Sequence, residues 1–187
     1  MDAFSYLSVL ISIILGLAVT QVLQGFRGLI LARARLTAYW PCVLWGILLL
    51  LIDVQAWWAM YDLRSYQNWS FLGFAVVLSE TVPLYLLAGL VFPDVSIEGE
   101  TNLHTHYFAH HRWFFALAML LMVASLLKTV TLYGNLPSRP DTAFQVAFFV
   151  VCAIAVWTHR EWYHKLLAIA ATAAFVAYIG ALFMRLQ

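Results

Sequence analysis

Charged residues are scarce in this chain. Of its 187 residues only 10% are charged, whereas 64% are apolar and 16% are aromatic. A soluble domain is about 25% charged, so this chain has too little polar surface to enclose a water-soluble core. The composition therefore excludes a soluble enzyme domain and indicates an integral membrane protein. A net charge of +1 also lacks the basic excess typical of nucleic-acid-binding proteins, so no nucleic-acid partner is expected.

Several catalytic motifs are absent as well. The chain has no glycine-rich phosphate-binding loop, no nucleophile elbow and no Cys-x-x-Cys pair. These motifs supply phosphate binding, acyl transfer and thiol redox chemistry. NTP-driven transport by this chain alone is therefore not expected.

Long apolar runs fill most of the sequence. A helix needs about 20 mainly apolar residues to cross a bilayer. Dividing the chain where charges, Pro, Gly and Asn gather gives six predicted spans, at residues 4–30, 40–60, 69–92, 113–133, 142–158 and 162–183. Tyr and Trp residues, which prefer the membrane interface, stand at these boundaries. We expect an all-α, polytopic integral membrane protein with a single domain, residues 1–187. Its six transmembrane helices would form one compact bundle with no soluble domain.

Lys and Arg residues are distributed unevenly between the two ends of these helices. The first, third and fifth connections and their helix edges hold Arg27, Arg33, Arg35, Arg112, Arg160 and Lys165. The opposite side holds Arg64, Lys128, Arg139 and Arg185. Positive residues favour the cytoplasmic side of a membrane. We therefore expect a plasma (inner) membrane protein with both termini outside.

The first predicted helix carries small and polar residues at intervals of three or four, which places them on one face. They are Ser5, Ser8, Ser12, Gly16, Thr20, Gln24 and Gly28. Such a face allows close helix packing and hydrogen bonds across the contact. It could instead line a hydrated path. We favour packing, because small-residue stripes are common in membrane helices.

Two acidic residues fall inside predicted spans. Glu80 lies near the middle of the third helix and Asp53 about two turns from the outer end of the second. A charge at such depth costs on the order of 3 kcal/mol unless it is paired, hydrated or protonated. Both residues therefore indicate function, although a neutral carboxyl in a structural hydrogen bond would also explain Glu80. The opposite directions of the two helices allow them to share one site.

Pro83 strengthens the interpretation of Glu80. A proline frees the carbonyl four residues earlier, here at Ser79, and tends to kink the helix. A free carbonyl and nearby hydroxyl groups, including that of Thr81, would suit a proton or a hard cation beside the Glu80 carboxylate. Lys128 could pair with either acid, but extension of its ammonium group to the interface is favoured.

All six histidines fall in the third and fifth connections or their edges, and hence on one side of the membrane. They are His104, His106, His110, His111, His159 and His164. In a helix, His106 and His110 would share a face at a spacing typical of metal ligands. Imidazole with nearby carboxylate suits Zn, Fe or Mn. Solvated histidines without a metal are favoured over a metal site, and a pH sensor that titrates near neutral pH is the third interpretation.

The His pattern also resembles a known family. The HxxxHH pattern of His106, His110 and His111 resembles one histidine box of the membrane-bound di-iron desaturases and hydroxylases. The HxxxxH pattern of His159 and His164 resembles another box. The resemblance implies histidine ligands to a metal. In a metal-dependent enzyme, Glu161 or Glu98 would be the base or bridging carboxylate. The chain's six histidines are fewer than that family's three boxes use.

Three hypotheses follow. The favoured one is a homo-oligomeric channel, carrier or membrane effector that moves protons or cations through the intramembrane acidic residues. The second is a metal-dependent enzyme that acts on a lipid or another hydrophobic substrate at the cytoplasmic face. The third is a structural subunit that contacts another membrane protein in a larger complex.

Overall fold

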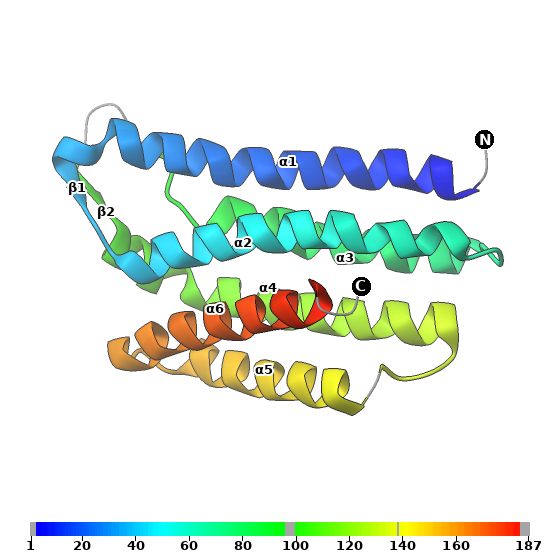
Figure 1. The fold of residues 1–187 in the computed structure, drawn as a ribbon. Helices are drawn as coiled ribbons and strands as arrows, with labels where there is room; N and C mark the ends of the chain where they lie inside the picture. Colours follow the sequence, from blue (N-terminus) through cyan, green and yellow to red (C-terminus); the bar gives the residue numbers. More distant parts are fainter. Residues whose placement is uncertain (1–2, 96–99, 138, 184–187) are drawn as a thin grey trace.

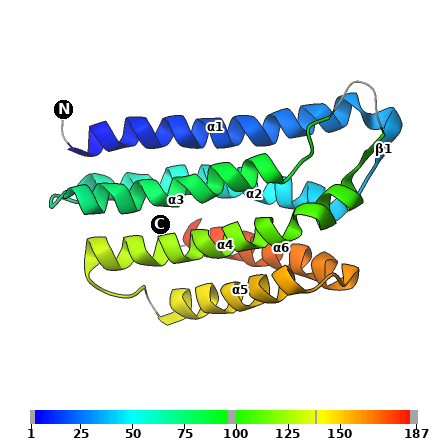
Figure 2. The same cartoon turned by 180° about the vertical axis from the view of Figure 1, so that it is seen from behind.

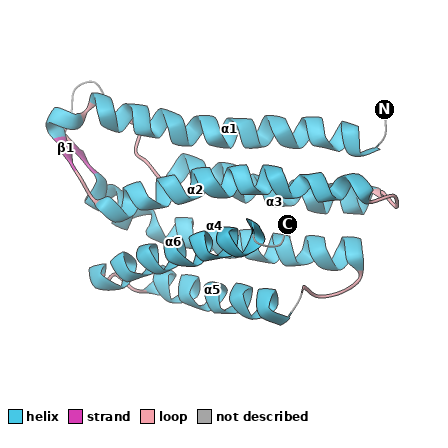
Figure 3. Ribbon diagram, viewed as in Figure 1, coloured by secondary structure: helices cyan, strands magenta, loops and turns pink. Residues whose placement is uncertain are grey.

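The computed structural model describes residues 3–95, 100–137 and 139–183. Arg185 and Glu98, used in the sequence arguments, lie outside these ranges. Most described residues are helical (Figure 3). The α-helices are α1 (Ala3–Leu31), α2 (Trp40–Ala59), α3 (Phe71–Leu90), α4 (Leu103–Tyr133), α5 (Arg139–Trp157) and α6 (Glu161–Phe183). Two 3₁₀ segments, η1 (Arg33–Arg35) and η2 (Met60–Ser65), follow α1 and α2. The predicted all-α class is confirmed.

Five helical segments are long and apolar enough to cross a membrane, namely those of α1, α2 with η2, α3, α4 and α6. The apolar part of α5, Asp141–Trp157, is shorter. Length and composition therefore fit a membrane protein. The topology of six spans remains a prediction.

Side-chain caps set the beginnings of two helices. Ser70 Oγ accepts a hydrogen bond from Gly73 N (3.1 Å) and begins α3. Asn102 Oδ1 accepts bonds from His104 N (3.0 Å) and Thr105 N (3.1 Å), so α4 begins well before the predicted start at Trp113. Residues 103–112 of the connection expected between Phe92 and Trp113 are thus helical. Such caps satisfy backbone N–H groups that the first helical turn leaves free.

Two short strands join connections that are far apart in sequence. β1 (Leu36–Thr37) follows η1, and β2 (Thr101–Asn102) precedes α4. They pair in parallel, with Leu36 opposite Thr101. This ladder, which the sequence did not predict, ties the connection after α1 to the start of α4.

The helices lie nearly parallel or antiparallel in a bundle (Figure 1). α1 lies on one side of α2 and α3, while α4, α6 and α5 lie on the other, as the view from behind also shows (Figure 2). Phe92, just after α3, packs against both α1 and α2. A Cβ atom at Gly25 or at Gly46 would clash with its ring. Glycine at these two positions therefore lets the three helices approach closely.

Candidate functional site

Glu80 and Lys128 form an ion pair that links α3 to α4. Lys128 Nζ donates a hydrogen bond to Glu80 Oε2, and the side chains are only 22% (Lys128) and 19% (Glu80) exposed. The expectation that Lys128 extends to the interface is therefore wrong. The physical reason is that an opposite charge lies within reach on the neighbouring helix. Two half-buried ions are more stable paired than apart.

Asp53 has no such partner. Its side chain is buried in the bundle, at 1% exposure, and neither carboxylate oxygen has a hydrogen-bond partner among the described residues. An ionised carboxylate in that position would cost several kcal/mol, on the order given for an unpaired buried charge. The arrangement therefore favours a neutral Asp53 that carries a proton.

Asp53 and Glu80 lie at a common depth. The Cys42 thiol donates a hydrogen bond to Val91 O (2.9 Å), which fixes the start of α2 beside the end of α3. Asp53 is eleven residues after Cys42, and Glu80 is eleven residues before Val91. At a rise of about 1.5 Å per residue, both acids are roughly 16 Å from that bond along antiparallel helices. Among the described residues, no hydrogen bond joins Asp53 to Glu80 or to Lys128.

The hydroxyl groups predicted to accompany Glu80 are directed elsewhere. Ser79 Oγ donates to Val76 O (2.7 Å), and Thr81 Oγ1 donates to Leu78 O (2.8 Å). Thr81 is buried, whereas Ser79 is exposed. Serine and threonine in helices commonly satisfy their hydroxyl groups on a carbonyl of the preceding turn. The structure therefore does not bring either hydroxyl to the Glu80 carboxylate.

The polar face of α1 points away from the bundle. The residues that α1 buries are apolar: Leu7, Ile11, Leu15, Ala18, Val22 and Leu29. Ser12, Thr20 and Gln24 are exposed, and Ser8 is half-buried. Thr20 Oγ1 donates to Gly16 O (2.7 Å) within its own helix. Within this chain the apolar face of α1 therefore makes most of the contacts with the other helices. Close helix packing through the polar face stays a prediction.

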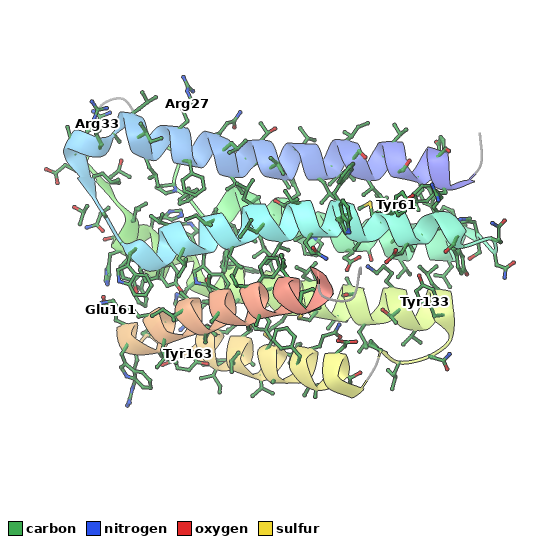
Figure 4. All side chains as sticks on the ribbon, in the orientation of Figure 1. Arg27, Arg33, Tyr61, Tyr133, Glu161 and Tyr163 are labelled. Carbon is green, nitrogen blue, oxygen red and sulfur yellow. The ribbon has the colours of Figure 1, made fainter. Side chains whose placement is uncertain are left out.

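The histidines gather at the end of the bundle where α4 and α6 begin. The His111 ring centroid lies 4.7 Å from that of His159 and 5.4 Å from that of His164. Arg112 Nη2 donates to His159 Nε2 (3.2 Å). The structure thus brings residues of the predicted third and fifth connections together. Figure 4 marks this end by Glu161 and Tyr163, with Tyr61 and Tyr133 toward the other end.

His164 has no free ring nitrogen. Its Nε2 donates to Thr158 O (3.0 Å), so Nδ1 accepts from the Tyr107 hydroxyl (3.1 Å). The ring is fully buried. In this conformation His164 is therefore a structural hydrogen-bonding residue and is not available as a metal ligand.

Three other histidines each use only one ring nitrogen in the hydrogen bonds of the described residues. His106 Nε2 donates to Leu90 O (3.0 Å), His110 Nδ1 to His106 O (3.0 Å) and His111 Nδ1 to Phe108 O (2.7 Å). The three rings line one small cavity of about 10 Å³. His111 Nε2 is buried there without a partner. Within the ranges that the structure describes, no three His, Cys, Asp or Glu side chains are arranged to hold a metal ion.

An aromatic cluster encloses the histidines, and sequence reasoning missed it. Tyr39, which precedes α2, has its ring centroid 5.0 Å from His104 and 5.2 Å from Tyr107. Burial, reinforced by the negative charge of Glu161, raises the pKa of the Tyr39 phenol above its usual value. Tyr39 therefore stays neutral. Its partners are more than 60 residues away in sequence, so no local pattern could reveal them.

No protein-family model, curated protein or solved structure matches this chain. The class of this protein is therefore argued from its structure alone. Six helices, five of them in segments long and apolar enough to span a membrane, define an all-α protein of the kind found in membranes. The charged side chains packed within the bundle include the Glu80–Lys128 pair and the unpartnered Asp53. Thr81, His111 and His164 are buried polar side chains as well.

Proposed function

We propose that this chain is a membrane channel, carrier or effector that moves protons, or other cations, by way of Asp53 and the Glu80–Lys128 pair. The observation that carries the proposal is the buried Asp53 carboxyl, which has no partner at the depth of an ion pair. A protein that needed only stability would hold an apolar residue there, because an unpartnered buried carboxyl is costly.

The charge balance of the three groups suggests how a proton moves. Two carboxyls and one ammonium group lie at one depth, so Lys128 can neutralise only one carboxyl at a time. Protonation of Glu80 releases Lys128, and loss of the proton from Asp53 creates a new negative charge. In each transfer one proton moves between the two carboxyl groups. The Lys128 ammonium group then moves from one carboxylate to the other.

The exposed polar face of α1 supports a homo-oligomer. Ser12, Thr20 and Gln24 would otherwise face lipid, whereas a second copy of α1 would cover them. Several copies could then enclose a path that a single bundle cannot. We further propose insertion in the plasma (inner) membrane with both termini outside, as the Lys and Arg distribution indicates.

Proton flux into proteoliposomes tests this function. The full chain is reconstituted in vesicles that contain a pH-sensitive dye, and a K⁺ gradient with valinomycin sets the membrane potential. We expect Asp53→Asn and Glu80→Gln each to lower the flux at least tenfold. Asp62→Asn, which removes an exposed acid from η2, is the matched control and should behave as wild type.

Folding is followed in the same samples by circular dichroism and thermal unfolding. A folded Asp53→Asn variant with wild-type flux would refute the role of Asp53. Flux that follows Na⁺ or K⁺ and not pH would assign the path to a cation. Absence of any flux, together with copurification of another membrane protein, would favour a structural subunit.

A metal-dependent enzyme is the second candidate, and one observation favours it. His106, His110 and His111 line the same cavity, and each bonds a backbone carbonyl through one ring nitrogen. Metal-bound histidines usually orient themselves in this way. Zn, Fe or Mn bound there would act as a Lewis acid or activate oxygen or water. Elemental analysis of the gently purified chain tests the candidate, because less than stoichiometric metal would eliminate it.

A further inference from the structure

A shallow groove follows the outer face of α5. Its volume is about 510 Å³, and its lining is almost wholly apolar: Phe149, Val150, Ala153, Ile154, Trp157 and Thr158. Ala153 is the smallest lining residue, and it lies one helical turn from both Phe149 and Trp157. Such a shallow groove along an apolar helix has the shape and polarity of a site for one acyl chain.

One end of the groove is marked as the membrane interface. Trp157, the last residue of α5, is 80% exposed, and tryptophan prefers the level of lipid headgroups. Thr158 is the groove's final lining residue, and its hydroxyl accepts a hydrogen bond from Arg160 N (3.4 Å). The chain therefore leaves the apolar layer where the groove ends.

Uncompensated positive charge lies beyond that end. His159 and Arg160 directly follow the groove, and Arg112 is held beside them by its bond to His159 Nε2. The nearest acid in sequence, Glu161, pairs with Lys165 (2.8 Å). In the part of the chain that the structure describes, neither Arg112 nor Arg160 has a carboxylate partner within 4.0 Å.

We propose that the α5 groove and the Arg112–His159–Arg160 cluster together bind one anionic phospholipid, with an acyl chain in the groove and the phosphate on the guanidinium groups. Guanidinium groups bind phosphate oxygens in paired hydrogen bonds. The position of the cluster fixes the direction of the lipid, because the cluster lies beyond the Trp157 end of α5. This inference does not depend on the proposed transport function.

The charge difference between headgroups gives the expected preference. Each Arg near a lipid surface contributes about 1 kcal/mol toward an anionic headgroup, or about fivefold in affinity. Two such residues therefore give roughly a 25-fold preference for phosphatidylglycerol over phosphatidylcholine. An apolar groove without the cluster would hold both lipids equally.

Native mass spectrometry of the delipidated full chain, titrated with phosphatidylglycerol or phosphatidylcholine, tests the proposal. Arg112→Gln/Arg160→Gln should abolish the preference for phosphatidylglycerol and leave phosphatidylcholine binding unchanged. The control is Arg27→Gln, since Arg27 projects away from α1, on the far side of the bundle from α5 (Figure 4). This control should keep most of the preference.

The groove itself is tested by Ala153→Phe and by Val150→Trp, the second at an exposed position where the fold is not strained. Both variants should weaken the binding of the two lipids by at least fivefold. The proposal is overturned if the double Arg variant keeps the preference of Arg27→Gln. Unchanged lipid binding in a folded groove variant would also overturn it. Dissociation of an oligomer by the groove variants would overturn it as well, because a second copy of the chain would then be the occupant of the groove.

Discussion

Replacing Lys128 by methionine should destabilise the bundle and leave Glu80 without its partner. Removing one member of a fully buried ion pair costs about 3–5 kcal/mol. Here the two side chains remain 22% and 19% exposed, so water still reaches part of the remaining carboxylate. We therefore expect a loss of about 2 kcal/mol in the free energy of unfolding for Lys128→Met, and a similar loss for Glu80→Gln.

The double variant separates this explanation from simple loss of packing. Glu80→Gln/Lys128→Met leaves no unpaired charge, so it should be within about 1 kcal/mol of wild type. The coupling energy of the cycle would then be about 3 kcal/mol. Reversible unfolding in mixed detergent and SDS micelles, followed by circular dichroism, provides the four stabilities.

A second ion pair provides the control. Lys165 pairs with Glu161 one turn earlier on α6, and both side chains are exposed. Lys165→Met should leave the stability unchanged, because water and ions screen such pairs. The reasoning is refuted if the Glu80 and Lys128 variants add independently, or if Lys128→Met is as stable as wild type.

Three further predictions follow from single contacts. Gly16→Leu should convert an oligomer to smaller species in native mass spectrometry without loss of stability, since a side chain at Gly16 meets nothing in its own chain. Gly89 is equally open, so Gly89→Leu is the control. An unchanged copy number in Gly16→Leu would exclude the α1 interface. Tyr107→Phe should lower the free energy of unfolding by about 2 kcal/mol, because it leaves the buried His164 Nδ1 without its donor; an equally stable variant would show that the bond contributes nothing. Asp53→Leu should raise the stability by about 1 kcal/mol while it abolishes proton flux, and lower stability with intact flux would make Asp53 structural.

Much of the helical framework could be predicted from the sequence. Apolar runs bounded by aromatic residues located the helices that begin at Trp40 and Phe71 to within about two residues, which is the usual uncertainty of a helix end. The sequence did not predict the early start of α4, because its first turns, residues 103–112, hold four histidines and an arginine. Those turns are helical since Asn102 caps them and an aromatic cluster covers one side. Hydropathy does not register either cause.

The lateral arrangement could not be predicted in the same way. The spacing of Ser12, Thr20 and Gln24 correctly placed them on one face, but the direction of that face depends on which face of α1 is more apolar. Lys128 is 48 residues from Glu80, so their pairing follows from how α3 and α4 pack. The depth of a residue in the membrane can be counted along its own helix. Which residues of other helices lie beside it cannot be derived from the sequence in this way.

The number of charged groups in the interior, unlike their pairing, can be read from the sequence. Two acids and one base at one depth cannot all be ionised and paired, so one carboxyl must be protonated or hydrated in every state of the bundle. Packing selects Asp53 for that role in this conformation, because Lys128 reaches Glu80. Glu80→Gln would remove the competitor for Lys128, and Asp53 would become the remaining acid at that depth. The sequence therefore determines that one acid has no basic partner, and the conformation determines which acid that is. A proton-transfer site requires this dependence on conformation.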